Sequence, residues 1–199
     1  MKVGYAVLYE DGELVISKNH TLLPKPILKD YGEFEDTNVP WAWCDDYFAI
    51  KQVRILNQVK SNCMNKWFAY CEDLTTSINM ENIDVSDCID FSYLFFKCKS
   101  LGNISFLKDW NVFNGKNFEG IFYGCESLMN CVDLQKWNLS NGNNFFRMFK
   151  DCITLKEIYL QNTINKLKFK MFDGCNPKLK IYWKDKIYTY EDLIEYKEL

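Results

Sequence analysis

The sequence predicts an α/β solenoid of about five short helix-plus-strand units, stacked so that their strands form one parallel sheet, with a β-hairpin cap at the N-terminus. Two observations carry this prediction. A segment with the pattern FEGIFYGCESL (residues 118–128) recurs along the chain, and its cysteine returns every 27 residues over four copies. Short runs of alternating apolar and polar residues lie between the copies. A fixed period of this length is the signature of stacked supersecondary units rather than of one globular core.

Residues 1–50 do not repeat, and we expect them to form the N-terminal cap. Val3–Tyr9 and Leu14–Ser17 are rich in β-branched and aromatic residues and flank the turn sequence EDGE, which predicts a hairpin. Residues 20–38 are polar, contain two prolines and are expected to be a loop. The aromatic run Pro40–Cys44 follows. Because a solenoid exposes an apolar cross-section at each end, this segment is expected to cover the first unit.

The recurring segments are apolar at their first, fourth, fifth and eighth positions. Offsets of i, i+3, i+4 and i+7 predict a helix of two turns with one buried face. An Asp or Asn before several copies is a suitable N-cap. The four regular copies are Met64–Cys71, Phe91–Cys98, Phe118–Cys125 and Phe145–Cys152, the N-cap candidates are Asp90, Asn117 and Asn144, and a looser fifth copy begins at Lys168 and contains Cys175.

Alternation between the copies predicts one strand per unit, with one side facing the core. A register shifted by one residue stays open, because Ile104 and Cys131 are also apolar. The expected inward pairs are Val53 and Ile55, Ile78 and Met80, Ser105 and Leu107, Val132 and Leu134, Ile158 and Leu160, and Ile181 and Trp183. The solenoid is thus expected over residues 51–183. Residues 184–199 are expected to form a C-terminal cap with a last strand and a polar turn or helix.

Two stretches resemble the BspA-like leucine-rich repeat: IFYGCESLMNCVDLQKWNLSN (residues 121–141) and MFKDCITLKEIYL (residues 148–160). That family repeats Met-Phe-x-x-Cys-x-Ser-Leu followed by Leu-Asp-Leu-x-x-Trp-Asn. The resemblance covers about residues 60–183 and implies a leucine-rich-repeat stack whose concave sheet recognises partners. Many family members are surface proteins of bacteria and protists for which adhesion is proposed, and similar repeats occur in phage and mobile-element proteins.

Composition excludes several classes of protein. With 48% hydrophobic and 17% aromatic residues, the chain is too apolar to be disordered. A net charge of −3 and a pI of about 5.3 argue against a nucleic-acid partner. No stretch approaches 18 apolar residues, so no membrane association is expected. The N-terminus lacks the pattern of a signal peptide, which predicts a cytoplasmic protein, or one in the host cytoplasm if its source is a phage.

Nine cysteines are present, and no two of them are spaced Cys-x-x-Cys. An odd number, five of them at one repeat position, predicts a column of free, buried thiols without metal or cofactor. His20 is the single histidine and has no nucleophile in its sequence context. A phosphate-binding glycine loop is also missing from the sequence. We therefore expect no enzyme and no catalytic residue.

Outward side chains of the strands are the expected binding site for a partner protein, because they differ from unit to unit on a rigid surface. They are Arg54, Asn79, Phe106, Asp133 and Tyr159, flanked by Lys108 and Gln135. The predicted function is non-enzymatic protein–protein recognition through the concave face. One alternative is a phage or mobile-element effector that inhibits a host defence protein by direct binding. Another is a structural component of a virion or a surface adhesin.

Overall fold

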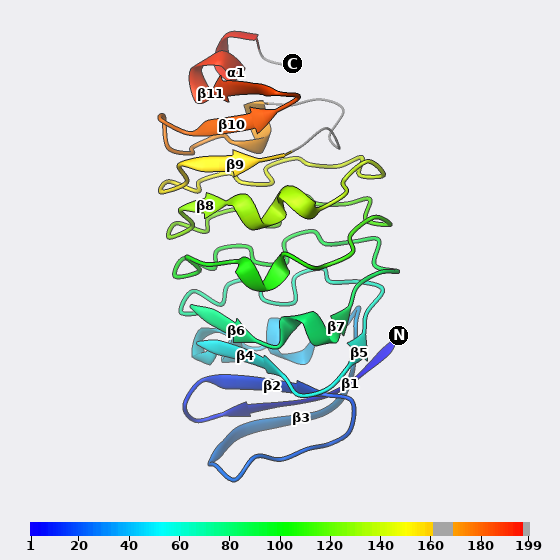
Figure 1. Ribbon diagram of the computed structural model, residues 1–199. Helices are drawn as coiled ribbons and strands as arrows, with labels where there is room; N and C mark the ends of the chain where they lie inside the picture. Colours follow the sequence, from blue (N-terminus) through cyan, green and yellow to red (C-terminus); the bar gives the residue numbers. More distant parts are fainter. Residues whose placement is uncertain (161–168, 197–199) are drawn as a thin grey trace.

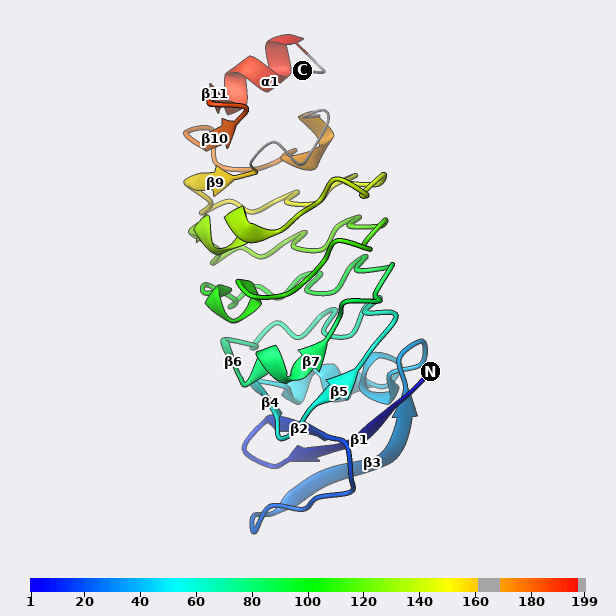
Figure 2. The ribbon, with the colours of Figure 1, turned by 45° about the vertical axis from the view of Figure 1, so that its right-hand side comes forward.

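The molecule is an elongated stack that runs from an N-terminal sheet to a C-terminal helix (Figure 1). The structure is a computed structural model and describes residues 1–160 and 169–196. Its regular part is a β-solenoid of about five turns. Successive rungs lie one above another between the N-terminal sheet and the last hairpin (Figure 2). The predicted solenoid is therefore confirmed, while Lys168, the expected start of the fifth copy, lies outside the described residues.

The N-terminal hairpin is present as predicted and continues into the solenoid. Strands β1 (Lys2–Tyr9) and β2 (Glu13–Ser17) pair antiparallel. Strand β2 pairs in parallel with β4 (Gln52–Ile55), and β4 pairs in parallel with β6 (Thr76–Ile78). All five residues of β2 are buried. The hairpin is thus the first layer of the core as well as its cover.

A third N-terminal strand replaces the loop expected over residues 20–38. Strand β3 (Ile27–Glu35) pairs antiparallel with β1 and completes a five-stranded sheet in the order β3-β1-β2-β4-β6. Phe34 is its one buried residue, so the strand lacks the alternation that would reveal it in the sequence. Its pairing occupies the backbone groups along the outer edge of β1, which would otherwise lack partners.

The helices expected in the recurring segments are wrong, because these segments form consecutive β-turns. In the copy Met64–Cys71, the N–H of Cys71 donates to the carbonyl of Phe68 (3.2 Å) and closes a four-residue turn. The third residue of that turn, Tyr70, has a φ of 65°. A positive φ at this position is what a type II turn requires, and it is incompatible with an α-helix. The Met64–Cys71 copy therefore becomes a flat ribbon of turns.

Backbone hydrogen bonds join each turn ribbon to the next one. The N–H of Phe68 donates to the carbonyl of Leu94 (2.9 Å), and the N–H of Tyr70 donates to that of Phe96 (2.7 Å). A helix would have directed these N–H groups back along its own chain. The apolar period still marks the buried side as predicted, with Phe145 half-buried. The buried members are Met64, Trp67, Phe68, Cys71, Phe91, Leu94, Phe95, Cys98, Phe118, Ile121, Phe122, Cys125, Met148, Phe149 and Cys152.

The three candidate N-cap residues begin the turn ribbons instead of helices. Their side-chain oxygens accept a hydrogen bond from the N–H two residues ahead, as in an Asx turn. The distances are 2.9 Å for Asp90, 3.2 Å for Asn117 and 3.1 Å for Asn144. The same three residues are linked by parallel β-bridges from unit to unit. They therefore mark the point where each unit enters its first turn.

The strand side of the solenoid contains two parallel ladders rather than one continuous sheet. The first ladder ends at β6, and the second joins β8 (Asn130–Cys131), β9 (Glu157–Tyr159) and β10 (Lys180–Trp183). Between them the chain forms the 3₁₀ helix η4 (Ser105–Leu107). Among the described residues, the other 3₁₀ helices are η1 (Pro40–Ala42), η2 (Asp45–Ala49), η3 (Met80–Asn82), η5 (Val132–Lys136) and η7 (Phe169–Met171). The short strands β5 (Val59–Lys60) and β7 (Ile83–Asp84) pair in parallel.

The strand register differs from the prediction in three central units. Ile104 and Cys131 are buried, while Ser105 and Val132, which were expected inside, are exposed. In the unit before them, Ser77 rather than Ile78 pairs with the inward-facing Val53. Each of these units has one more residue between its two inward positions. This residue lies just before η3 in the first unit and within η4 and η5 in the other two. The pairs at 53 and 55, 158 and 160, and 181 and 183 have no extra residue and are buried as predicted.

Trp110 and Trp137 lie at the corners that follow these turns, and both are buried. The indole N–H of Trp110 donates to the carbonyl of Met80 (3.2 Å), and that of Trp137 donates to the carbonyl of Leu107 (2.9 Å). Each tryptophan therefore fastens its unit to the preceding one.

The C-terminal end is closed by a hairpin and a short helix, in line with the predicted cap. Strand β11 (Lys186–Thr189) pairs antiparallel with β10, and helix α1 (Tyr190–Tyr196) follows. Thr189 and Asp192 cap this helix reciprocally, with Asp192 accepting from the Thr189 N–H (2.6 Å) and donating its own N–H to the Thr189 hydroxyl (3.2 Å). Leu193 is buried and holds the helix on the last rung.

Candidate functional site

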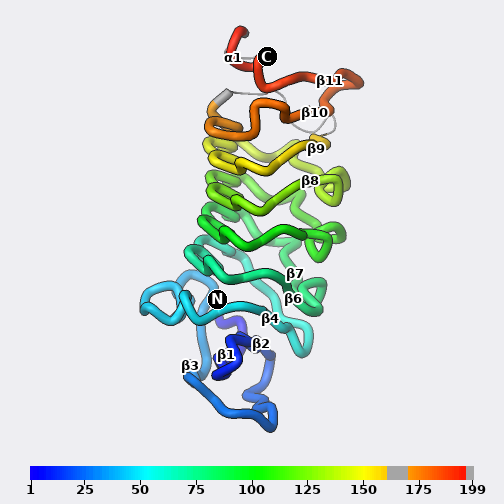
Figure 3. Tube along the Cα trace, turned by 90° about the vertical axis from the view of Figure 1, so that its left-hand side faces the viewer, coloured from blue at the N-terminus to red at the C-terminus, as the bar shows by residue number. Residues whose placement is uncertain are grey.

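The outward side of the strands and of turns η3, η4 and η5 is the surface on which the predicted binding residues lie, and we call it the strand face (Figure 1). It lies on the opposite side of the stack from the turn ribbons (Figure 3). Asn79, Lys108 and Gln135 are exposed on it, and Phe106, Asp133 and Tyr159 are half-buried. They follow one another from unit to unit along the stack rather than converging on one point.

Arg54 is held by a carboxylate of the N-terminal hairpin. Its Nε donates to Glu13 (2.6 Å), which also accepts from Gln52 (2.7 Å) and pairs with Lys25. Burial by itself would raise the pKa of Glu13, but the hydrogen bonds from Lys25 and Arg54 outweigh it and lower that pKa. The guanidinium of Arg54 thus links the solenoid to its cap. The same contact occupies the Nε–H of Arg54, a residue that the sequence suggested for binding a partner.

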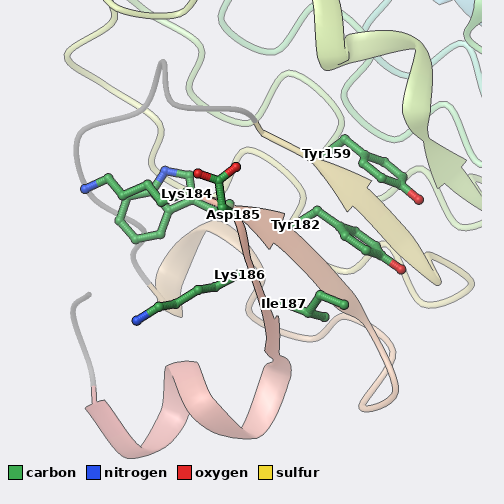
Figure 4. Close-up of a pocket in the computed structure, with 7 residues that line it drawn as sticks. Tyr159, Tyr182, Lys184, Asp185, Lys186 and Ile187 are labelled. Carbon is green, nitrogen blue, oxygen red and sulfur yellow. The ribbon is translucent and has the colours of Figure 1, made fainter.

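A hollow of about 370 Å³ opens at the C-terminal end of the strand face, where β9, β10 and β11 lie side by side (Figure 4). The rings of Tyr159 and Tyr182 stack in parallel with centroids 4.2 Å apart and planes 6° apart. Ile187 is the cross-strand neighbour of Tyr182 and is 59% exposed. These three side chains form one apolar row across three strands, which we call the tyrosine row.

The sequence singled out Tyr159 but did not include Tyr182 and Ile187 in the site. Tyr182 occupies the outward position between the buried residues Ile181 and Trp183. Ile187 lies in the last strand, where an apolar residue facing solvent breaks the expected pattern. An exposed apolar residue at an outward strand position was the available signal. This signal could be recognised only once the pairing of Tyr182 with Ile187 in the C-terminal hairpin was known.

A second hollow of about 400 Å³ lies where the two parallel ladders are interrupted. Phe106 borders it, and its ring meets that of the core residue Phe95 edge-on at 6.0 Å. Phe106 is therefore partly a core residue. The Oγ atom of Ser77 is buried at this gap without a hydrogen-bond partner among the described residues. The other lining residues are Thr76, Glu81, Asn103, Ser105, Lys108 and Asp109.

The repeated cysteines form a column of free thiols in the core. The Cys125 thiol donates to the Phe95 carbonyl of the preceding unit (3.2 Å). The thiols of Cys98, Cys152 and Cys175 each donate to the equivalent Phe carbonyl of their own preceding unit, at 2.9–3.1 Å. Burial raises the pKa of the Cys125 thiol and, outside the column, raises that of Cys88 to about 12. A thiol must lose its proton to act as a nucleophile or metal ligand. The column is therefore suited to packing rather than to chemistry.

Other polar residues considered as chemical candidates are engaged locally. His20 contacts Asp30 (2.7 Å) and lies at the surface. Asp46 accepts hydrogen bonds from Lys29 (2.8 Å) and Tyr31 (2.9 Å). Within residues 1–160 and 169–196, no three His, Cys, Asp or Glu side chains are grouped so as to hold a metal ion.

The part of the chain that the structure describes contains no helix with the length and apolar character needed to cross a membrane. Comparison of the chain with curated proteins and with solved structures gave no match. A family profile described as "Mycoplasma protein of unknown function, DUF285" matches residues 57–180, more than half of the chain. The matched segment runs from just before β5 to the first residue of β10 and so covers most of the solenoid. The chain therefore belongs to the DUF285 family.

Proposed function

We propose that this protein is a non-enzymatic recognition module that binds a partner protein through its strand face, with the tyrosine row as the anchor. The observation that carries the proposal is the stacked pair Tyr159 and Tyr182 beside the exposed Ile187. Tyrosine is among the residue types that dominate binding energy in protein interfaces, and the exposed Ile187 extends the apolar surface beside the two rings. Their place on three paired strands limits the ordering cost of binding.

The resemblance of residues 60–183 to BspA-like leucine-rich repeats supports the same function, because that family is expected to recognise partners with its sheet. Variation along the strand face also supports it. Asn79, Phe106, Asp133 and Tyr159 differ in chemistry from unit to unit, whereas the buried positions repeat. Lys108 and Gln135 would form a polar rim around the apolar contacts.

Site-specific photo-crosslinking tests the proposal in the cells that produce the protein. A benzophenone amino acid replaces Ile187 in one variant and Ile153 in a control, since both side chains are more than half exposed and apolar. We expect a discrete crosslinked product with one protein from position 187 and none from position 153. Identical product patterns from both positions would refute the strand face as the binding surface.

Affinity for the captured protein is then measured by calorimetry with two triple variants. The tyrosine-row variant is Y159S/Y182S/I187S, and the control F113S/M129S/I153S changes three other exposed apolar side chains. We expect the first to weaken binding by at least about a hundredfold, because hot-spot residues cost about 2 kcal/mol or more each. The control should bind as the wild type does. Equal affinities of all three proteins would end the proposal.

A further inference from the structure

The turn ribbons lie on the side of the stack away from the strand face (Figure 3). They and the adjoining cap segment Trp43–Phe48 carry a second row of outward side chains. This row, which we call the turn-face stripe, combines aromatic rings with cations. Its rings are Trp43, Tyr47, Phe48, Tyr70, Phe96, Tyr123 and Phe146, and its cations are Lys66, Lys97, Arg147 and Lys170.

Ring contacts connect most of the stripe from unit to unit. Tyr47 lies 5.7 Å from Tyr70, which meets Phe96 edge-on at 5.0 Å, and Phe96 meets Tyr123 at 4.9 Å. At the N-terminal end, Trp43 is 66% exposed. A tryptophan this exposed is unusual beside a well-packed core and marks a surface available for contact.

Each cation of the stripe lies over one or two of these rings, within the range of a cation–π interaction. None of the four forms an ion pair with a carboxylate among the described residues. The distances from cation to ring centroid are 5.7 Å for Lys66 and Trp43, 5.4 Å for Lys97 with both Tyr70 and Phe96, 4.6 Å for Arg147 and Phe146, and 5.8 Å for Lys170 and Phe146.

Carboxylates on the same ribbons already have partners within the chain. Glu119 accepts from the hydroxyl of Tyr93 and from the amide of Asn144 (3.0 Å). The other pairs are Glu72 with Lys99 at 2.8 Å, Asp173 with Lys150 at 2.6 Å and Asp151 with Lys150 at 3.7 Å. Tyr93 and Asn144 are neutral donors, so Glu119 keeps its negative charge, and the two aspartates that share Lys150 keep one more between them. The four stripe cations still outnumber these uncompensated carboxylates, although the chain as a whole is acidic.

The backbone indicates that the cations are not required by the fold. Lys66, Lys97 and Arg147 have φ values of 58°, 57° and 56°, a left-handed conformation that disfavours long side chains. In the unit of residues 118–125, the corresponding turn positions are filled by Gly120 and Gly124, which adopt this conformation without penalty. Glycine thus serves the turn at these positions, and the cations occupy it at a conformational cost.

We propose that the turn-face stripe binds an extended acidic segment of a partner protein. Stacked core rings of adjacent units are 5.3–5.8 Å apart, and hydrogen-bonded rungs are spaced by about 4.8 Å. An extended peptide places side chains on one side every ~6.6 Å, so a segment that spans several rungs could place carboxylates near Lys66, Lys97 and Arg147. The unit of residues 118–125 lies between the last two and contributes no stripe cation. Apolar residues of the segment would lie on the exposed rings. This site is independent of the strand face and of the function proposed for it.

The test uses fluorescence anisotropy with a labelled twelve-residue peptide of alternating Glu and Thr. We expect binding in 50 mM salt that is weakened about tenfold in K66Q/K97Q/R147Q, because exposed charge pairs contribute modestly and additively. Salt at 0.5 M should weaken it further. The matched control K116Q/K156Q/K178Q removes three exposed cations elsewhere, and it should bind as the wild type does, as should Y159S/Y182S/I187S.

Several outcomes would overturn the proposal. These are no binding of the Glu-Thr peptide beyond that of a Lys-Thr peptide, equal losses in both glutamine variants, and tighter binding of single-stranded dT12 than of the peptide. Peptide binding that is displaced by self-association of the chain would assign the stripe to a second copy instead. If circular dichroism shows that K66Q/K97Q/R147Q is unfolded, K66G/K97G/R147G replaces it, because glycine suits these turns.

Discussion

The turn side and the strand side of this solenoid differ in regularity. On the turn side, the units share the same four-residue turns, and the rings Phe68, Phe95, Phe122, Phe149 and Phe172 stack at 5.5–5.8 Å. On the strand side, two ladders are separated by η4, and the outward residues change with each unit. The regular turn side therefore holds the stack together, and the residues of the strand side are free to vary.

The difference has a physical origin in where the backbone hydrogen bonds go. In the turn ribbons, alternate N–H groups close turns or donate to the next unit, so an inserted residue would disrupt both sets. On the strand side, the extra residue of the central units is absorbed in or just before a 3₁₀ turn, while the inward residues on both sides of it stay buried. An inserted residue is therefore expected to cost less stability on the strand side than on the turn side.

Truncation of a core side chain gives the largest expected difference in stability between the turn side and the strand side. Phe122→Ala, on the turn side, should lower the free energy of unfolding by about 3–5 kcal/mol, because it removes a fully buried ring. Phe106→Ala, on the strand side, should cost about 1–2 kcal/mol, since that ring is half-buried and meets one core ring edge-on. Urea denaturation measures both. Equal losses would show that the two sides support the core alike.

The ion pair at the start of the strand face is expected to have an intermediate effect. Glu13→Gln should cost about 2 kcal/mol at pH 7, because hydrogen bonds to a buried charged group are lost. The pKa of Glu13 is lower in the folded state than its ordinary value of 4.5. Its contribution is therefore complete above about pH 4.5 and disappears as pH falls through the folded-state pKa.

Denaturation of wild type and E13Q between pH 2 and pH 7 checks this dependence. The difference in stability between the two proteins should shrink on acidification. Arg54→Gln serves as the control on the other side of the pair and should also destabilise the protein. If R54Q has wild-type stability, Arg54 belongs to the variable binding surface and not to the junction between cap and solenoid.

The smallest effects concern left-handed residues of the turn side. Gly124 and Asp151 occupy the same position in adjacent units, with φ values of 74° and 57°. Gly124→Ala should cost about 1–2 kcal/mol, because a side chain is disfavoured there and the new Cβ would lie 3.2 Å from Lys97. Asp151→Gly should be neutral or stabilise by up to about 1 kcal/mol. Thermal unfolding measures both, and a stabilising G124A would contradict the assigned turn geometry.

Much of the core was predictable from residue type. The positions equivalent to Phe122 and Cys125 are buried in most units, and the hairpin of β1 and β2 follows from its strand and turn sequences. Tyr159 was predictable as an outward residue because single residues alternate around it. Its partner Ile187 was not, since strand β11 has no buried residue and its sequence therefore carries no core-facing alternation.

The period and the inward side of each turn ribbon were determined by the sequence alone, since the polarity of each side chain records whether it meets water. The tertiary structure decided the backbone conformation. Spacing of i, i+3, i+4 and i+7 places four residues on one side both in a helix and in two consecutive turns. The turns prevail because a neighbouring rung accepts N–H groups such as that of Tyr70. That acceptor lies 26 residues away in the chain, so local sequence cannot reveal it.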